Sequence, residues 1–464
     1  IGSNGYVSFA GDNIASPFPA AIPSSSGAND FLAPFMSDLN FSGTGNPATC
    51  YYYSNTDTVC ISYHNVPYWT SLGNNWTGSN TFQIILNKSD LSITFNYLSS
   101  NMGTNTSVDM AIGTENVSGS LGLGVAFDSI PDDSATIKFY YPSVVTFAVT
   151  DGGIGWTGNA RSTGIFVNSQ GGGITLDANV KNFGNQALGT FNVNDTVFEL
   201  GGSGVTGGTL SIPSLGVGKD TNVTFTNQFT PPGDGIFIYE SYVSGISGDL
   251  TASNNALQME IVAIDTTQST MTLEYTDEAP DGTGLGWNGG NGGIGIYIEP
   301  PFYPAKIVSS RFYISAIGTA GFFAKIYDDN GTNGGPGTLL DSNYVGAGNI
   351  TINQYTTVPV DSDYLVIDSG GVYLLWHMAG AGINLGRDLT APFSRQTYEV
   401  LAGSWAEYRD RLTEDFLLGL NVEYTYPIAD FSMNATMDPQ INFTDLTLNK
   451  PTKWEWDFGD GSAL

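Results

Sequence analysis

The chain has 464 residues, of which 14 are Lys or Arg and 44 are Asp or Glu, so its formal net charge is −30. Nucleic acid and anionic lipid both require a basic protein surface, and this charge therefore argues against both as partners. No run of about 18 apolar residues occurs, so we expect no membrane span.

The composition is typical of β-sandwiches. Gly (59 residues), Tyr (24) and Phe (26) are plentiful, and with Asn, Thr and Ser they are the residues that strands and tight turns prefer. No stretch longer than about two turns shows a helical period of 3.6 residues. The sequence therefore predicts an all-β protein with several β-sandwich domains in series, arranged as different modules in a row. Its length allows roughly three or four of them.

Residues 1–142 form the first predicted unit, a β-domain in which alternating apolar residues predict strands at 81–88 and 91–97. The Ser-Asn-Gly-Tyr-Val-Ser-Phe opening, the Ala-Pro-Phe-x-x-Asp-Leu segment and the Ile-Gly-Thr-Glu-Asn turn resemble the nidogen-like domain of bacterial and animal extracellular proteins. That family usually has further strands before Ser-Asn-Gly, so the resemblance implies that N-terminal strands are missing here.

Two cysteines, Cys50 and Cys60, flank a predicted hairpin in this unit. We expect them to face each other near the base of the hairpin and to form a disulfide, with two buried free thiols as the alternative. A disulfide would imply an oxidising, extracytoplasmic setting.

Residues 143–264 are predicted to form an immunoglobulin-like sandwich. The segment 174–181 alternates cleanly between apolar and polar residues, and further strands are predicted at 209–215, 221–225 and 235–243. The Val-Lys-Asn-x-Gly segment, the Leu-Gly-Val-Gly-Lys turn and the closing Ser-Asn-Asn resemble the bacterial and archaeal adhesion modules called CARDB.

Residues 265–426 are predicted to form a jelly-roll-like β-sandwich, with strands at 307–315, 321–327, 371–376 and 417–424. The Ile-Tyr-Asp-Asp-x-Gly segment and the Pro-Gly-Thr-Leu-Leu segment that follows it resemble the non-catalytic sandwiches of large secreted bacterial proteins, especially those of type IX secretion.

Residues 427–464 resemble the start of a PKD domain. The segments 428–431 and 441–445 stand where that family has its first strands, and Trp-Glu-Trp-Asp-Phe-Gly-Asp-Gly at 454–461 stands at its hallmark turn. Some 36 residues are too few to close a sandwich alone. We therefore expect the last domain to be truncated and the chain to be a piece of a longer polypeptide.

The sequence predicts no catalytic residue. The only histidines, His64 and His377, lie in strand-like segments, where packed or surface positions are expected. No Gly-x-Ser-x-Gly elbow, zinc-ligand spacing or phosphate-binding loop accompanies them. The many acidic residues give no single carboxylate pair that stands out for sugar hydrolysis. We therefore expect that the chain is not an enzyme.

Two kinds of ligand contact are predicted. Closely spaced Asp and Asn oxygens in a Gly-rich turn suit Ca²⁺, and the alternative is a solvated hairpin loop. The candidate ligands are Asp328, Asp329, Asn330, Thr332 and Asn333, although Leu339 stands where such loops end in a carboxylate. Trp287, in a glycine-rich loop, is the candidate for contact with a sugar, and the alternative is a core position.

Eleven Asn-x-Ser/Thr sites are candidates for glycosylation, and they weakly favour surface exposure in an extracellular protein. They are Asn40, Asn75, Asn87, Asn105, Asn116, Asn194, Asn222, Asn330, Asn349, Asn434 and Asn442.

These observations lead to the hypothesis of a non-catalytic extracellular structural or adhesive protein. It would be part of a cell-surface stalk, fibre or filament that acts through contacts between β-domains. The expected partners are other copies of the chain, other surface proteins or glycans. The alternatives are accessory modules of a large secreted hydrolase, and carbohydrate-binding modules.

Overall fold

The computed structural model describes residues 1–9, 19–24, 29–70, 73–105, 109–116, 119, 121–141, 148–277, 279–361, 365–401, 403–424, 430–435 and 441–447. Regular structure in these ranges consists of β-strands and three short 3-10 turns, η1 (Ala252–Asn254), η2 (Thr332–Gly334) and η3 (Ala347–Asn349). The all-β prediction is confirmed. No helix in the described part of the chain is long and apolar enough to cross a membrane.

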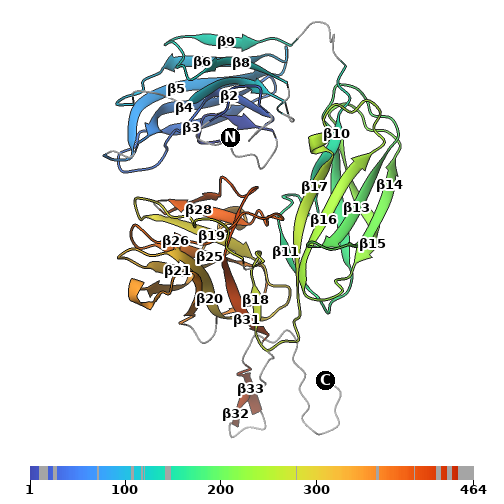
Figure 1. The fold of residues 1–464 in the computed structure, drawn as a ribbon, viewed down its shortest axis with the longest axis vertical. Coiled ribbons are helices and arrows are strands. Elements are labelled where there is room, and N and C mark those ends of the chain that lie inside the picture. Colours follow the sequence, from blue (N-terminus) through green and yellow to red (C-terminus); the bar gives the residue numbers. More distant parts are fainter. Residues whose placement is uncertain are drawn as a thin grey trace.

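The first sandwich consists of two antiparallel sheets (Figure 1). Large aromatic side chains fill the space between them: the Phe82 ring stacks on Phe35 and on Tyr63, with ring centroids 4.9 and 4.5 Å apart. One sheet has the order β1 (Val7–Ser8), β2 (Phe31–Ser37), β7 (Met110–Glu115), β8 (Gly122–Phe127). The other has the order β3 (Thr49–Ser54), β4 (Thr58–Trp69), β5 (Trp76–Asn87), β6 (Ile93–Ser99), β9 (Thr136–Phe139).

The second sandwich shows the alternation read from the sequence. Leu176, Ala178 and Val180 of β12 are buried, because every second side chain of a strand faces the same way. One sheet has the order β10 (Gly152–Thr157), β12 (Ile174–Asn182), β15 (Asp220–Phe229). The other has the order β11 (Ile165–Asn168), β17 (Ala256–Ile264), β16 (Gly235–Ser244), β13 (Phe191–Glu199), β14 (Gly204–Ile212), with β11 parallel to β17.

The third sandwich has two larger sheets. One has the order β18 (Met271–Leu273), β31 (Leu418–Tyr424), β20 (Ala305–Ala316), β23 (Gln354–Pro359), and β24 (Val366–Ile367) and β26 (Asn384–Leu385) also pair with β20. The other has the order β22 (Leu339–Val345), β21 (Phe322–Asp328), β25 (Val372–Met378), β19 (Gly292–Ile298), β28 (Thr397–Leu401), β29 (Ser404–Glu407). A two-stranded ribbon joins β27 (Arg387–Asp388) to β30 (Asp415–Phe416).

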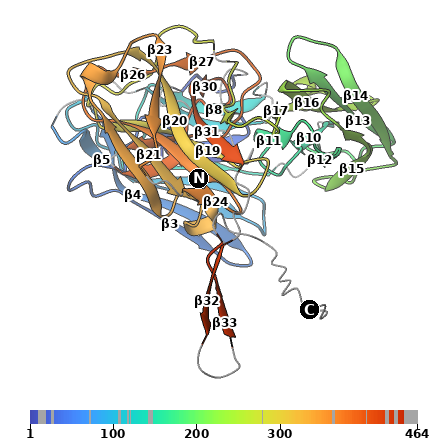
Figure 2. The same cartoon turned by 90° about the horizontal axis from the view of Figure 1, so that it is seen from below.

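The last described element is a hairpin of β32 (Phe431–Ala435) and β33 (Ile441–Asp445), which projects away from the sandwiches (Figure 2). It contains the expected segment 441–445 as β33, but β32 takes only Phe431 from the expected segment 428–431, and residues 428 and 429 lie outside the described residues. The turn at 454–461 lies outside the described residues. Each sheet takes its strands from one predicted unit, and the boundaries at 142, 264 and 426 stay predictions.

The sequence predicts modules in a row. The three sandwiches are not arranged in that way. The first sandwich lies over the third, and the second lies alongside (Figure 1). Electrostatic contacts agree with this arrangement. Burial raises the pKa of Asp38, in the first sandwich, to about 6, while the Arg409 guanidinium of the third sandwich acts to lower it.

Candidate functional site at the interdomain interface

The predicted disulfide is wrong. β3 pairs with β4 so that Cys50 lies opposite Tyr63 and Cys60 lies opposite Tyr53, and both thiols are free. Cys50 is three residues from Tyr53, so the two cysteines point to opposite faces of the sheet and are offset by roughly 10 Å along it. The register is set by Asn55, whose side-chain oxygen accepts bonds from the backbone N–H of Asp57 (2.9 Å) and Thr58 (2.7 Å).

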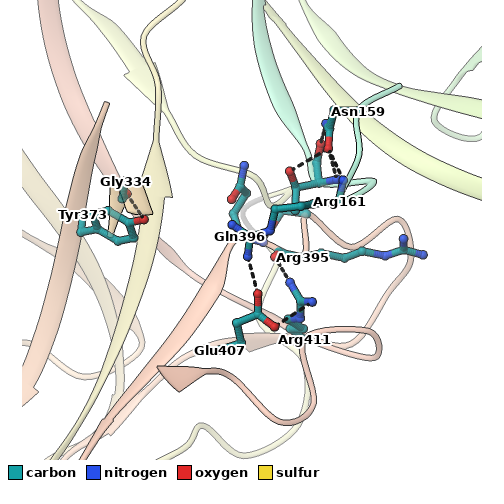
Figure 3. Close-up of polar contacts among 10 residues, drawn as sticks. Asn159, Arg161, Gly334, Tyr373, Arg395, Gln396, Glu407 and Arg411 are labelled. Atoms are coloured by element: carbon teal, nitrogen blue, oxygen red, sulfur yellow. Dashed lines mark hydrogen bonds and ion pairs between the residues drawn. The ribbon is translucent and has the colours of Figure 1, made fainter. Parts of the chain in front are cut away.

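Three of the five candidate calcium ligands, Asp328, Asp329 and Asn330, take part in hydrogen bonds of the loop. The Asn330 amide nitrogen donates to Asp328 Oδ2 (3.1 Å), and the Asn330 oxygen accepts from the backbone N–H of Thr338 (2.9 Å). The Asp329 carboxylate accepts instead from the Tyr297 hydroxyl (3.1 Å). Thr332 and Asn333 lie in η2, which the Tyr373 hydroxyl holds through the Gly334 carbonyl (2.8 Å; Figure 3).

These bonds are those of a hairpin loop, as in the alternative interpretation. No group of three or more His, Cys, Asp or Glu side chains stands in metal-binding geometry among the residues that the structure describes. Calcium binding at this loop therefore stays a prediction.

Trp287 is part of the packing of the third sandwich. Its indole lies against the core cluster, and a Cβ placed on Gly292 would come within 2.2 Å of the ring. The glycine is needed because the ring lies directly on the backbone there. Sugar contact by Trp287 stays a prediction, but this close packing favours the core alternative.

Two of the glycosylation candidates are buried. The Asn40 amide nitrogen donates to the Asn75 carbonyl (2.5 Å), and that of Asn194 donates to Ser244 Oγ (2.9 Å). Both predictions are corrected, because a glycan needs this nitrogen exposed. Asn87, Asn105 and Asn116 are partly exposed, and the exposed candidates are Asn75, Asn222, Asn330, Asn349, Asn434 and Asn442.

The two histidines lie in different sandwiches. His64 is exposed beside the Tyr51 ring, and burial lowers the pKa of the partly buried His377. A shallow groove of about 310 Å³ between β22 and β23 is lined by one carboxylate, Asp361, and by no histidine or cysteine.

A set of polar contacts that we did not predict from the sequence lies between the second and third sandwiches. Gly164, just before β11, donates its N–H to the Ser394 carbonyl (2.6 Å). Its own carbonyl accepts from the Tyr275 hydroxyl (3.1 Å) and from Gln396 Nε2 (3.0 Å). The backbone of the second sandwich is thus bonded to three residues of the third.

An apolar contact lies beside these hydrogen bonds and adds to the interface. Phe166 of β11 and Val262 of β17 belong to the core cluster of the third sandwich, and the Phe166 and Tyr275 ring centroids are 4.4 Å apart. The other face of β17 carries Met259 and Ile261, which belong to the core of the second sandwich. β17 is therefore buried on both faces. The unbroken apolar segment Ile-Val-Ala-Ile at its end is the sequence signal that could have revealed this.

Charged groups close one side of the interface (Figure 3). Arg161 of the second sandwich forms an ion pair with Glu407 of β29. The other Glu407 oxygen accepts from Arg411 Nη2 (3.0 Å), and Arg411 Nη1 donates to the Arg395 carbonyl (3.0 Å). Bonds of this kind connect the two modules at the edge of their interface.

A second candidate surface is the outer edge of the first sandwich. β3 is the end strand of its sheet, and within the described residues it pairs only with β4. Tyr51, Tyr52 and Tyr53 on this strand are 59%, 64% and 59% exposed. Edge strands with unpaired backbone groups are the places where another chain can add a strand.

No known family model and no curated protein matches the chain. Among solved structures it is similar to the CARDB domain of PF1109 from Pyrococcus furiosus, solved in complex with di-metal ions. The identity is 19% over 26% of this chain and 97% of that one, with a TM-score of 0.20.

Two secreted or surface proteases are also similar to parts of the chain. One is the structure of the cysteine protease and lectin-like domains of Cwp84, a surface layer associated protein of Clostridium difficile, with 11% identity over 51% of this chain and 58% of that one and a TM-score of 0.25. The other is the secreted serine protease VesC of Vibrio cholerae, with 11% identity over 63% and 62% and a TM-score of 0.18. Likenesses of this size assign no function.

Proposed function

We propose that this chain is a non-catalytic extracellular structural or adhesive protein that associates through β-domain edges. The observation that carries the proposal is the exposed tyrosine strand β3, with Tyr51, Tyr52 and Tyr53 at the edge of its sheet. Tyrosine offers a large, rigid contact area and a hydroxyl, and it is enriched in protein interfaces. Another copy of the chain is the partner we propose.

The joined second and third sandwiches support a mechanical role. The bonds at Gly164 and the shared apolar contact of Phe166 and Val262 hold the two modules as one stiff piece. A stiff piece beside an exposed edge transmits force to whatever pairs with that edge. The net charge of −30 opposes association of copies at low ionic strength, so contact requires screening by salt.

The test is sedimentation velocity over a range of protein concentrations, at low salt and at physiological salt. We expect wild-type protein to associate with rising concentration in salt. A variant with Tyr51, Tyr52 and Tyr53 all changed to Ser should stay monomeric. The matched control is Tyr344→Ser, which removes an exposed tyrosine from β22, another end strand. Wild-type protein that stays monomeric under every condition contradicts association through copies.

Each of the two alternative functions predicts a different experimental result. Recovery of a hydrolase domain in the same reading frame favours accessory modules of a secreted enzyme. A glycan array on which the triple tyrosine variant loses wild-type binding favours carbohydrate-binding modules, because exposed aromatic rings also serve as sugar platforms.

A further inference from the structure

Glu260 is a buried acid at the interface of the second and third sandwiches. It lies on β17 between Met259 and Ile261, which face the core of the second sandwich. Side chains alternate along a strand, so Glu260 shares the outer face with Val262, which packs into the third sandwich. The exposed fraction of Glu260 is 0%.

Neither carboxylate oxygen of Glu260 has a hydrogen-bond partner. It lines a cavity of about 10 Å³, roughly the room of one water molecule. The second sandwich contributes Leu200 and Ile236 to the lining, and the third contributes Tyr275, Asp277, Asp388, Thr390, Ala391 and Pro392. None of these described lining residues is Lys, Arg or His.

The charged groups that act on Glu260 are acidic. Asp415 and Asp388, on the ribbon of β30 and β27, both disfavour its ionised form. Arg387, next to Asp388 in the chain, does not balance the charge of Glu260, because its Nη1 is paired with Glu414 Oε2 at 2.9 Å. On its own sheet, Glu260 lies opposite Ile238 of β16.

A buried carboxylate without a partner is tolerated when it is protonated, because the neutral acid avoids most of the cost of desolvation. We propose that the interface between the second and third sandwiches is a proton-dependent latch: protonated Glu260 keeps it closed, and ionisation of Glu260 beside Asp388 and Asp415 opens it.

The direction of the pH dependence follows from the pKa shifts. Burial raises the pKa of Glu260 well above its usual 4.5, and burial raises the pKa of Asp388 to about 6 and that of Asp415 to about 7. In the closed form these groups bind protons more tightly than in an open, hydrated form. Opening is therefore suppressed below about pH 4, and it becomes easier as the pH rises through about 6 to 7 and beyond.

Hydrogen exchange at the Gly164 amide measures the latch directly, because this N–H is bonded across the interface to Ser394. For each group that stays protonated in the closed form and ionises on opening, the opening constant rises about tenfold per pH unit. We expect the protection of a peptide covering 160–168, corrected for the intrinsic exchange rate, to fall by at least about tenfold between about pH 5 and pH 8. A peptide inside β13 should not change with it.

Glu260→Gln keeps the shape of the side chain but cannot ionise. We expect the protection of its 160–168 peptide to fall less than that of the wild type between about pH 5 and pH 8, because only Asp388 and Asp415 remain to ionise on opening. The matched control, Glu240→Gln, changes an acid of β16 on the same sheet and should follow the wild type.

Three outcomes would overturn the proposal. The first is wild-type protection that does not change with pH, and the second is a Glu260→Gln profile parallel to that of the wild type. The third is closure of the wild type by added CaCl₂ at high pH, which would mean that a cation and not a proton balances the acids.

Discussion

At the scale of single residues, two buried glutamates differ in whether their carboxylates have hydrogen-bond partners. Glu274, just after β18, accepts bonds from Arg311 Nε (2.5 Å), from Thr276 Oγ1 (2.9 Å) and from the Tyr355 hydroxyl. Glu260 has no such partner. Burial raises the pKa of both, but an arginine opposes the shift only at Glu274. The first is therefore a structural ion pair, and the second is a proton-sensitive position.

Removing the arginine tests the ion pair. We expect Arg311→Met to lower the free energy of unfolding of the third sandwich by about 3–5 kcal/mol, because it leaves a buried charge without compensation. Urea unfolding measures this loss. Arg311→Met combined with Glu274→Gln should recover part of the stability, since the charge is then gone too. A single variant that unfolds at the wild-type urea concentration contradicts this role.

At the scale of elements, close approach at Gly164 joins the two sandwiches. A Cβ at this position would lie 2.9 Å from Tyr275 Cε1 and 3.2 Å from Ser394 Cα. One of these atoms belongs to backbone, which cannot move away easily. The glycine is therefore required by the docking of the two modules.

A methyl group at Gly164 should separate the modules. We expect Gly164→Ala to cost about 1–3 kcal/mol of unfolding free energy, the usual range for overpacking, and to raise exchange in the 160–168 peptide. The matched control is Gly172→Ala, because a Cβ on Gly172 meets nothing within 4 Å. Equal behaviour of the two variants would mean that the interface is looser than its bonds indicate.

The elements also show what the sequence could and could not predict. Period-two alternation located β12 at 174–181, to within one residue, and the predicted strand at 81–88 overlaps β5, which ends at Asn87. The interface was not predicted, because Glu260 and Asp388 come together only when two sandwiches dock, and local periodicity does not report docking. The predicted hairpin is present, but the predicted disulfide is not, because the turn at Asn55 sets a register in which Cys50 and Cys60 are not opposite each other.

At the scale of the whole molecule, the net charge of −30 is the dominant electrostatic feature. The three sandwiches lie close to one another (Figure 1), so the excess negative charge of the chain is held in a small volume. Repulsion of this kind disfavours the compact form and weakens as salt shortens the screening length.

We therefore expect the melting temperature to rise with salt. Between about 0.01 and 0.5 M NaCl the screening length falls from about 30 Å to a few ångströms. A gain of about 1 kcal/mol corresponds to roughly 2–4 °C for a domain of this size. Scanning calorimetry measures the shift, and choline chloride in place of NaCl separates ionic strength from sodium binding. A melting temperature that falls with salt would mean that ion pairs outweigh the repulsion.

The double burial of β17 has a consequence for how this protein is inherited and engineered. A gene fragment ending at residue 264 would encode a module that exposes Phe166, Val262 and the unpaired carboxylate of Glu260 on its surface. We expect such a module to be poorly soluble. We therefore expect the second and third sandwiches to be inherited together, and to be cloned together, as one unit.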